Sequence, residues 1–229
     1  MSISSLSQQV YDALYERLLT SQLRPGDEIN RRAVAKDLGV SLSPVLEAMT
    51  QLEWEGFLET RARRGTLVRR VTARQVLGRM HLRIAIETQA ARIYAGPQIA
   101  AARDRMLALA AANDATQPGT RGSFDHEVTF HRALVALSDS PGLTDTFDHV
   151  MRHSIYHTAV RLLPMCPTRH SAKHVKLVKG LLAASPEQAD TLIRAHLNPW
   201  LELLTQAADA EAEAGPVAAL PRRGGSPRA

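Results

Sequence analysis

The sequence has a single cysteine, Cys166, among its 229 residues. One cysteine cannot form an internal disulfide, which is typical of proteins from a reducing cytoplasm. No uninterrupted apolar run approaches the ~20 residues that a membrane-spanning helix needs. The first segment carries Asp12, Glu16 and Arg17 and lacks the basic region and continuous apolar core of a signal peptide. We therefore expect a cytoplasmic protein without a membrane partner.

Acidic residues are absent between Glu59 and Glu87, although the formal net charge of the whole chain is only +5. The arginines of this interval are Arg61, Arg63, Arg64, Arg69, Arg70, Arg74, Arg79 and Arg83. A basic stretch of this kind suits a phosphate backbone. An ordinary solvated basic face has the same composition, so charge alone leaves both interpretations open.

The first part of the chain, residues 1–71, has the pattern of a winged helix-turn-helix domain. The expected elements are helices at 6–20 and 31–38, a third helix between Ser43 and Gly56, and strands at 57–60 and 66–69 around a basic loop, 61–65. Asn30 is a predicted N-cap and Gly39 a predicted C-cap of the second helix. Ser43, followed by Pro44, is the predicted N-cap of the third helix. Two helices, a short break, a third helix and an arginine-tipped hairpin favour DNA binding over a purely structural α+β domain.

The second part of the chain, residues 72–210, reads as helix throughout. The predicted helices lie at 72–95, 98–113, 122–138, 141–163, 168–184 and 186–210, separated by breaks rich in proline and glycine. Because no strand pattern interrupts them, we expect a bundle of six helices. Residues 211–229 hold few large apolar side chains and are predicted to be a disordered tail. The fold class is therefore mostly α, with a winged helix-turn-helix followed by an all-helical domain.

A series of short motifs occurs in fixed order in the N-terminal part. They are Val10 to Leu14, Leu23 to Asp27, Leu38 to Ser41, Pro44 with Val45, Glu47 with Ala48, Leu52 with Glu53, Gly56 with Phe57, and Gly65. In this order they resemble the winged-helix signature of the GntR family of regulators. That resemblance implies a homodimer that binds a roughly palindromic double-stranded operator.

A second series of motifs occurs in the helical part. They are Arg83 with Glu87, Phe130 to Leu134, His174, and Arg194 to Leu197. These are similar to the ligand-binding FCD domain of the FadR branch of the family, and six helices resemble its VanR-type subgroup. The resemblance covers about residues 8–208 and implies release or rearrangement on DNA when an effector binds.

The predicted DNA-binding residues come from the second helix, the third helix and the wing. They are Arg31, Arg32, Ser41, Ser43, Gln51, Arg61, Arg63, Arg64 and Gly65. Leu42 and Leu46 stand where the family usually has arginine, and Arg31 replaces a usual glutamate. Leucine offers no donor to a base edge or phosphate. We therefore expect phosphate anchoring from Arg31, Arg32 and the wing, with weaker sequence specificity.

A metal site is predicted in the helical domain. Glu127 and His131 are four residues apart, so both project from one helix face and can share a metal ion. Many FCD-type domains hold a metal with one aspartate and three histidines, and the resemblance adds His174 and His196, with Glu127 in the aspartate's place. Three imidazoles and a carboxylate suit Zn²⁺, Ni²⁺ or another first-row divalent ion.

Other histidines lie near the predicted site or repeat at helical spacing. A rival set, His149, His153 and His157, has no accompanying carboxylate, and we expect it to be a solvated or packing face. Asp125 and His126 share the His131 face less well than Glu127 does. Ser140 replaces a usual asparagine after the third bundle helix, with no predicted consequence for the fold.

The predicted effector is a small organic acid. Four protein ligands in a six-coordinate shell leave two positions for a carboxylate, and an arginine would pair with its charge. Arg83 matches the family position and Arg161 is a weaker choice, although an ion pair of Arg83 with Glu87 is an alternative. A metallohydrolase that uses Glu127, His131, His174 and His196 is a further alternative, although no HExxH motif or nucleophile elbow is present. An effector-independent DNA-binding protein is another.

Overall fold

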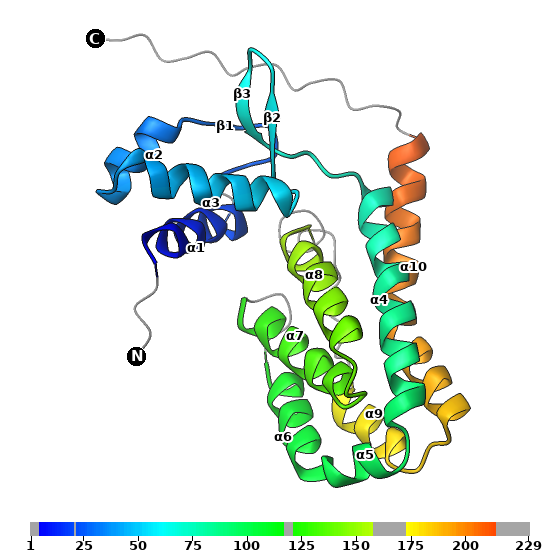
Figure 1. The fold of residues 1–229 in the computed structure, drawn as a ribbon. Helices are drawn as coiled ribbons and strands as arrows, with labels where there is room; N and C mark the ends of the chain where they lie inside the picture. Colours follow the sequence, from blue (N-terminus) through cyan, green and yellow to red (C-terminus); the bar gives the residue numbers. More distant parts are fainter. Residues whose placement is uncertain (1–4, 21, 117–120, 158–172, 214–229) are drawn as a thin grey trace.

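The computed structural model describes residues 5–20, 22–116, 121–157 and 173–213, without the side chains of 121–124 and 152–157. Arg161, Cys166 and the predicted tail beyond Glu213 lie outside the described residues, as do the side chains of His153 and His157. The described chain forms a winged helix-turn-helix and a helical domain, joined after the wing (Figure 1).

The N-terminal domain contains three helices and a three-stranded antiparallel sheet. In chain order these are α1 (Leu6–Leu19), β1 (Glu28–Ile29), α2 (Arg31–Leu38), α3 (Leu42–Trp54), β2 (Leu58–Arg61) and β3 (Gly65–Val68). The strand order is β1-β3-β2, and β2 pairs with β3 from Leu58 opposite Val68 to Arg61 opposite Gly65. A separate apolar core, which includes Leu14, Val45 and Phe57, holds these elements together.

Local signals explain both boundaries of α2. The side chain of Asn30 accepts hydrogen bonds from the backbone N–H groups of Arg32 and Ala33, and Gly39 ends α2 at φ 66°, so both predicted caps of α2 are confirmed. The predicted N-cap Ser43 is wrong, because α3 begins at Leu42 with Ser41 at the N-cap. Pro44 is accommodated there because the first N–H groups of a helix have no intrahelical partner.

The wing differs in detail from its prediction. Both hairpin strands are displaced from the predicted ranges by one residue, and Arg61 and Gly65 are paired strand ends rather than loop residues. The tip is therefore residues 62–64, with Arg63 in the left-handed region at φ 64°. Gly65 has φ 75°, and a Cβ there would lie 3.0 Å from Oε1 of Glu28 on β1. Glycine is favoured at this position by the backbone angle, since the nearby Glu28 carboxylate is the end of a flexible side chain that can move aside.

The C-terminal domain is entirely helical in its described part. Its elements are α4 (Ala73–Tyr94), α5 (Pro97–Ala101), α6 (Arg103–Asp114), α7 (Arg121–Ala136), α8 (Pro141–His157), α9 (His174–Leu181) and α10 (Pro186–Glu213). The described part of this domain thus contains seven helices rather than the predicted six, because the segment 98–113 divides at Ala102 into α5 and α6. Helix α10 also continues to Glu213, past the predicted boundary at 210. One apolar core spans the domain.

Helices α4 and α10 of the C-terminal domain lie side by side, and the chain that leaves β3 enters this domain at the start of α4 (Figure 1). At the start of α4, Thr72 and Gln75 form a capping box, and the backbone N–H of Ala73 donates to Glu211 near the end of α10. A contact between the domains is made where the ring of Trp54 on α3 meets the ring of His149 on α8 edge to face, with centroids 6.1 Å apart. Within the described residues, no helix is both long and apolar enough to span a membrane.

Candidate functional site

All nine predicted DNA-binding residues are exposed in the N-terminal domain. They are Arg31, Arg32, Ser41, Ser43, Gln51, Arg61, Arg63, Arg64 and Gly65. Helix α3 follows α2 after a short break, and the wing extends beyond them (Figure 1). This is the arrangement by which a winged helix-turn-helix presents one helix to the major groove.

Some of these side chains already have partners within the domain. Arg31 donates to the Thr66 hydroxyl at 2.9 Å, which ties the start of α2 to the wing strand β3. Arg61 pairs with Glu59 on the same strand at 2.7 Å. Among the described residues, the side chains of Arg32 and Arg64 make no hydrogen bond, so their guanidinium groups are available to an anion.

The exposed face of α3 is apolar and acidic rather than basic. Leu42 and Leu46 are 41% and 38% exposed, and α3 contains no lysine or arginine. Ser43 donates to Glu47 at 3.3 Å, and the amide of Gln51 donates to Glu55 at 3.1 Å. The polar side chains that remain on this helix are therefore partly engaged with carboxylates of the same helix or its C-cap.

The second site is a cluster of three histidines inside the helical domain. His131 on α7, His174 at the first residue of α9 and His196 on α10 each offer a ring nitrogen, and these nitrogens lie within 4.8 Å of one another. His131 and His174 are buried, with 0% and 3% exposure. Residues separated by tens of positions in the sequence are thus brought together by three different helices.

Two carboxylates fix the orientation of two of the imidazole rings. Oε2 of Glu87 lies 2.6 Å from Nδ1 of His131, and Oδ1 of Asp114 lies 2.7 Å from Nδ1 of His174. A carboxylate only accepts hydrogen bonds, so these close contacts favour the proton on each Nδ1. Each Nε2 then faces Glu127, at 3.1 Å from His131 and 3.0 Å from His174.

Glu127 lies between these two imidazoles and a buried arginine. Arg83 on α4 donates from Nη2 to Oε1 of Glu127 at 2.9 Å and from Nε to Oε1 of Glu87 at 2.6 Å. The ion pair of Arg83 with Glu87, which the sequence offered as an alternative to an effector contact, is therefore formed. It lies within α4, and the contact that joins two helices is the one from Arg83 to Glu127.

The electrostatics of the cluster follow from its burial. Burial alone would raise the pKa of Glu87, but His131 and Arg83 outweigh it and lower this pKa to about 2. Burial likewise opposes the charged form of Glu127, whose pKa nevertheless falls well below its ordinary value beside His131. The pKa of His196 falls to about 3, because burial and then the neighbouring His131 disfavour its protonated form. His196 is thus held as the neutral imidazole.

The donor set fits a divalent first-row metal ion. Nε2 of His131 is buried and has no partner in hydrogen-bonding geometry, although Oε1 of Glu127 is 3.1 Å away. An unpaired buried nitrogen is costly, and coordination of a cation would satisfy it. Three imidazole nitrogens with one carboxylate are the ligands that Zn²⁺ and Ni²⁺ accept.

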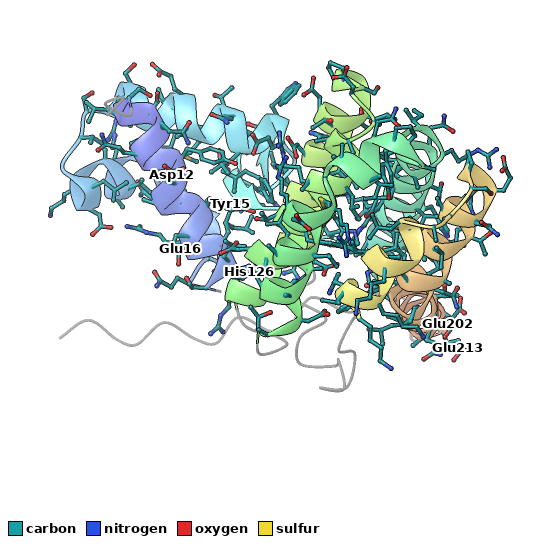
Figure 2. All side chains as sticks on the ribbon, turned by 90° about the horizontal axis from the view of Figure 1, so that it is seen from below. Asp12, Tyr15, Glu16, His126, Glu202 and Glu213 are labelled. Carbon is teal, nitrogen blue, oxygen red and sulfur yellow. The ribbon has the colours of Figure 1, made fainter. Side chains whose placement is uncertain are left out.

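The structure places the other predicted residues away from the cluster. His126 and Asp125 are exposed, and the labelled His126 lies on the outside of α7, on the side of α1 (Figure 2). The ring of His149 contacts Trp54, and the side chains of the other members of the rival set, His153 and His157, lie outside the described residues. Asn113 and Asp114 at the end of α6 were missed by the sequence analysis. Their only sequence signal is two polar residues at a helix end, which is ordinary for a C-terminus.

A helix-turn-helix with a basic wing, attached to a helical domain with a buried histidine cluster, defines a class: DNA-binding transcriptional regulators. Comparison with known families agrees with this class. Residues 6–68 match the model described as bacterial regulatory proteins, gntR family, and residues 79–199 match the FCD domain. The chain therefore belongs to the GntR family of regulators that carry an FCD domain, and the resemblance inferred from its motifs is confirmed.

Individual relatives carry the same class of name. Over 203 residues the chain is 27% identical to a probable D-xylose utilization operon transcriptional repressor of Paenarthrobacter nicotinovorans, covering 86% of this chain and 88% of that protein. Over 127 residues it is 34% identical to the Nta operon transcriptional regulator of Aminobacter aminovorans, covering 54% and 59%. These relatives do not distinguish between subgroups of the FadR branch, so membership of the VanR-type subgroup stays a prediction.

Solved structures show the same fold. A putative GntR regulator from Rhodococcus sp. RHA1 superposes with a TM-score of 0.70 at 20% identity, covering 89% of this chain and 99% of that chain. The McbR/YncC protein of E. coli superposes with a TM-score of 0.66 at 22% identity, again covering 89% of this chain and 99% of that chain. Relatives and fold are those of transcriptional regulators, and neither favours the metallohydrolase alternative.

Proposed function

We propose that this protein is a metal-dependent, ligand-responsive regulator that binds its operator as a homodimer. The observation that carries the proposal is the buried cluster of His131, His174 and His196, held in a domain joined directly to a DNA-binding domain. Relatives named for a D-xylose utilization operon and an Nta operon support control of an operon by this chain as well.

The metal would be held by the three imidazoles and by Glu127. Bound there, a divalent ion would supply open coordination positions for an anionic ligand. The chain's own residues would hold its ligands in place, because Glu87 and Asp114 orient two of the imidazoles and Arg83 restrains the carboxylate of Glu127. Such partners of the ligands commonly determine metal affinity.

The effector would be a small organic acid that reaches both the metal and Arg83. Nη2 of Arg83 is 2.9 Å from Glu127, so an incoming carboxylate would share or replace this contact. Helix α10 offers a route to the DNA-binding domain, because it carries His196 near its middle and Glu211 near the start of α4. A movement of His196 on effector binding would thereby shift α10 and alter its contact with the start of α4, beside the wing.

On DNA, the homodimer would place two copies of α3 and two wings on a two-fold-related site. Phosphate anchoring would come from Arg31, Arg32, and the wing residues Arg61, Arg63 and Arg64, while Leu42 and Leu46 give α3 only apolar contacts. An arginine at the wing tip would favour a narrow, A·T-rich minor groove. Sequence specificity would then be lower than in relatives with basic recognition helices.

The experiment measures oligomeric state and DNA binding of the full chain with and without Zn²⁺ or Ni²⁺. We expect a dimer at micromolar concentration, binding to a genomic fragment that weakens steeply with salt, and one bound metal per chain. A monomer that shifts no genomic fragment at low salt would refute the operator-binding dimer. A dimer that binds DNA but takes up neither metal would leave the effector-independent regulator as the correct alternative.

A further inference from the structure

Two consecutive residues at the C-terminal end of α6, Asn113 and Asp114, contact the histidine cluster from a helix that carries none of its ligands. The carboxylate of Asp114 accepts three hydrogen bonds: Oδ1 from the backbone N–H and Nδ1–H of His174, at 3.0 and 2.7 Å, and Oδ2 from the backbone N–H of Val175, at 3.0 Å. The amide nitrogen of Asn113 lies 3.1 Å from Oε2 of Glu127 and 3.1 Å from Nε2 of His174.

The contact from Asp114 selects a tautomer of His174. In the neutral ring, Asp114 and Glu127 compete for one proton, because Oδ1 of Asp114 lies 2.7 Å from Nδ1 and Oε2 of Glu127 lies 3.0 Å from Nε2. The closer carboxylate, Asp114, favours the proton on Nδ1, so that Nε2 keeps its lone pair. The same nitrogen faces Glu127 and the other histidines. Without Asp114, the neutral imidazole of His174 could carry its proton on Nε2. A protonated Nε2 has no lone pair with which to ligate a metal.

The same carboxylate also fixes the helix on which His174 lies. Helix α9 begins at His174, and its N-cap residue, Lys173, makes no side-chain capping bond. The first N–H groups of a helix need acceptors from outside it, and Asp114 supplies them to His174 and Val175. One side chain therefore holds both the backbone and the ring of His174 against α6.

Asn113 restrains the carboxylate in a complementary way. The two oxygens of Glu127 each have a donor, with Nη2 of Arg83 on Oε1 and the amide of Asn113 on Oε2. Glutamate has one more rotatable bond than aspartate, so it loses more conformational freedom when it is held in one position. Asn113 is 7% exposed, so it is itself packed in place.

We propose that Asn113 and Asp114 are positioning residues of the metal site: Asp114 sets the tautomer and the backbone position of His174, and Asn113 sets the carboxylate of Glu127. This inference rests on the proposed metal-dependent function. Helix α6 thus supports a metal site whose ligands come from α7, α9 and α10.

The test uses the full-length chain and two measurements. The first is Zn²⁺ affinity, by competition with a chromophoric chelator, for Asp114→Ala, Asp114→Asn and Asn113→Ala. The matched control is Asp104→Ala, an exposed carboxylate on the same helix. We expect Asp114→Ala to weaken Zn²⁺ binding about 10–100-fold, with a smaller loss for Asp114→Asn, which keeps one acceptor oxygen, and for Asn113→Ala. The control should stay within about twofold of wild type, since it touches no ligand.

The second measurement is the ¹⁵N NMR signature of the His174 ring in metal-free protein, which reports the tautomer even if α9 frays. We expect Nδ1–H in wild type and in the control, and a shift toward Nε2–H in Asp114→Ala. Unchanged Zn²⁺ affinity in the Asp114 and Asn113 variants would overturn the proposal, and so would a loss of affinity with an unchanged tautomer, since Asp114 would then be a helix cap alone. If wild type binds no Zn²⁺, the metal-dependent function fails, while the tautomer measurement still decides the role of Asp114.

Discussion

The two domains use charge in opposite ways. Around the histidines of the helical domain, the charged side chains of Arg83, Glu87 and Glu127 are shielded from solvent and contact one another or His131. In the winged domain the arginines lie on the surface, and Arg32, Arg63 and Arg64 extend into solvent. A metal site needs ligands held in fixed positions away from water, whereas a phosphate backbone needs cations that are free to meet it. The difference predicts which substitutions change stability and which change only affinity.

The largest expected effect is on the buried charges. Arg83→Met should deprive the carboxylates of Glu87 and Glu127 of their guanidinium partner and lower the free energy of unfolding by about 3–5 kcal/mol. The matched surface change is Arg61→Met, which breaks the ion pair with Glu59. Because the Arg61 side chain is 50% exposed, this change should lower the free energy of unfolding by at most ~1 kcal/mol. Urea unfolding of metal-free protein measures both. Equal losses for the two variants would contradict the contrast between the domains.

The second-largest expected effect on stability is that of removing a metal ligand. His196→Ala should abolish tight binding of Zn²⁺ and with it the stabilisation that bound metal gives, about 2.7 kcal/mol at a free metal concentration of ~100 Kd. For a chain of this size that corresponds to a Tm lower by roughly 5–10 °C in Zn²⁺. The matched control is His126→Ala, an exposed histidine next to Glu127 in the sequence, which should keep both the metal and the Tm. If His126→Ala is the variant that loses the metal, the site is misassigned.

The fold was predictable where its signals are local. Asn30 and Gly39 define α2 because each acts within a few residues of its own position. By contrast, β1 has only two residues and exists through pairing with β3, almost forty residues later, so no local pattern indicates it. The division of 98–113 at Ala102 is also invisible in the sequence, because the alanines and Arg103 around it all favour a helix.

The candidate site was predictable only in its ligand types. Glu127 and His131 are linked by helical spacing, but His174 and His196 were added by resemblance to a family and not by spacing. Asp114 acts on a residue 60 positions away, and nothing about an aspartate at a helix end indicates such a partner. Residues that orient ligands from a distance are determined by how helices pack, which the sequence pattern does not specify.

The third prediction concerns the exposed arginines of the wing. Replacing Arg63 and Arg64 together with alanine should weaken binding to specific and random DNA alike, about 10–100-fold at ~0.1 M salt, because each lost phosphate contact removes one released counterion. The slope of log affinity against log salt should fall by about 0.9 per contact. Stability should hardly change, since both side chains lie in solvent. The titration is repeated with Arg132→Ala, on the helical domain, which should leave the slope unaltered.

The smallest expected effect is a gain, and it tests how α3 meets DNA. Leu46 is 38% exposed on a helix without lysine or arginine, so Leu46→Arg adds a cation to a face that now offers only apolar and acidic groups. One added phosphate contact should tighten binding roughly fivefold to tenfold at ~0.1 M salt and raise the salt slope by about 0.9. If the new arginine instead reaches a guanine edge, the gain should be confined to a subset of sequences, because a bidentate pair discriminates by about 1–3 kcal/mol.

Leu6→Arg, which changes an exposed leucine on α1, is the matched control for added charge and should have less effect on DNA affinity. An unchanged affinity in Leu46→Arg, together with loss of binding on substitution of Ser43 or Gln51, would mean that α3 reads bases through its polar edge and that the wing is not the dominant contact.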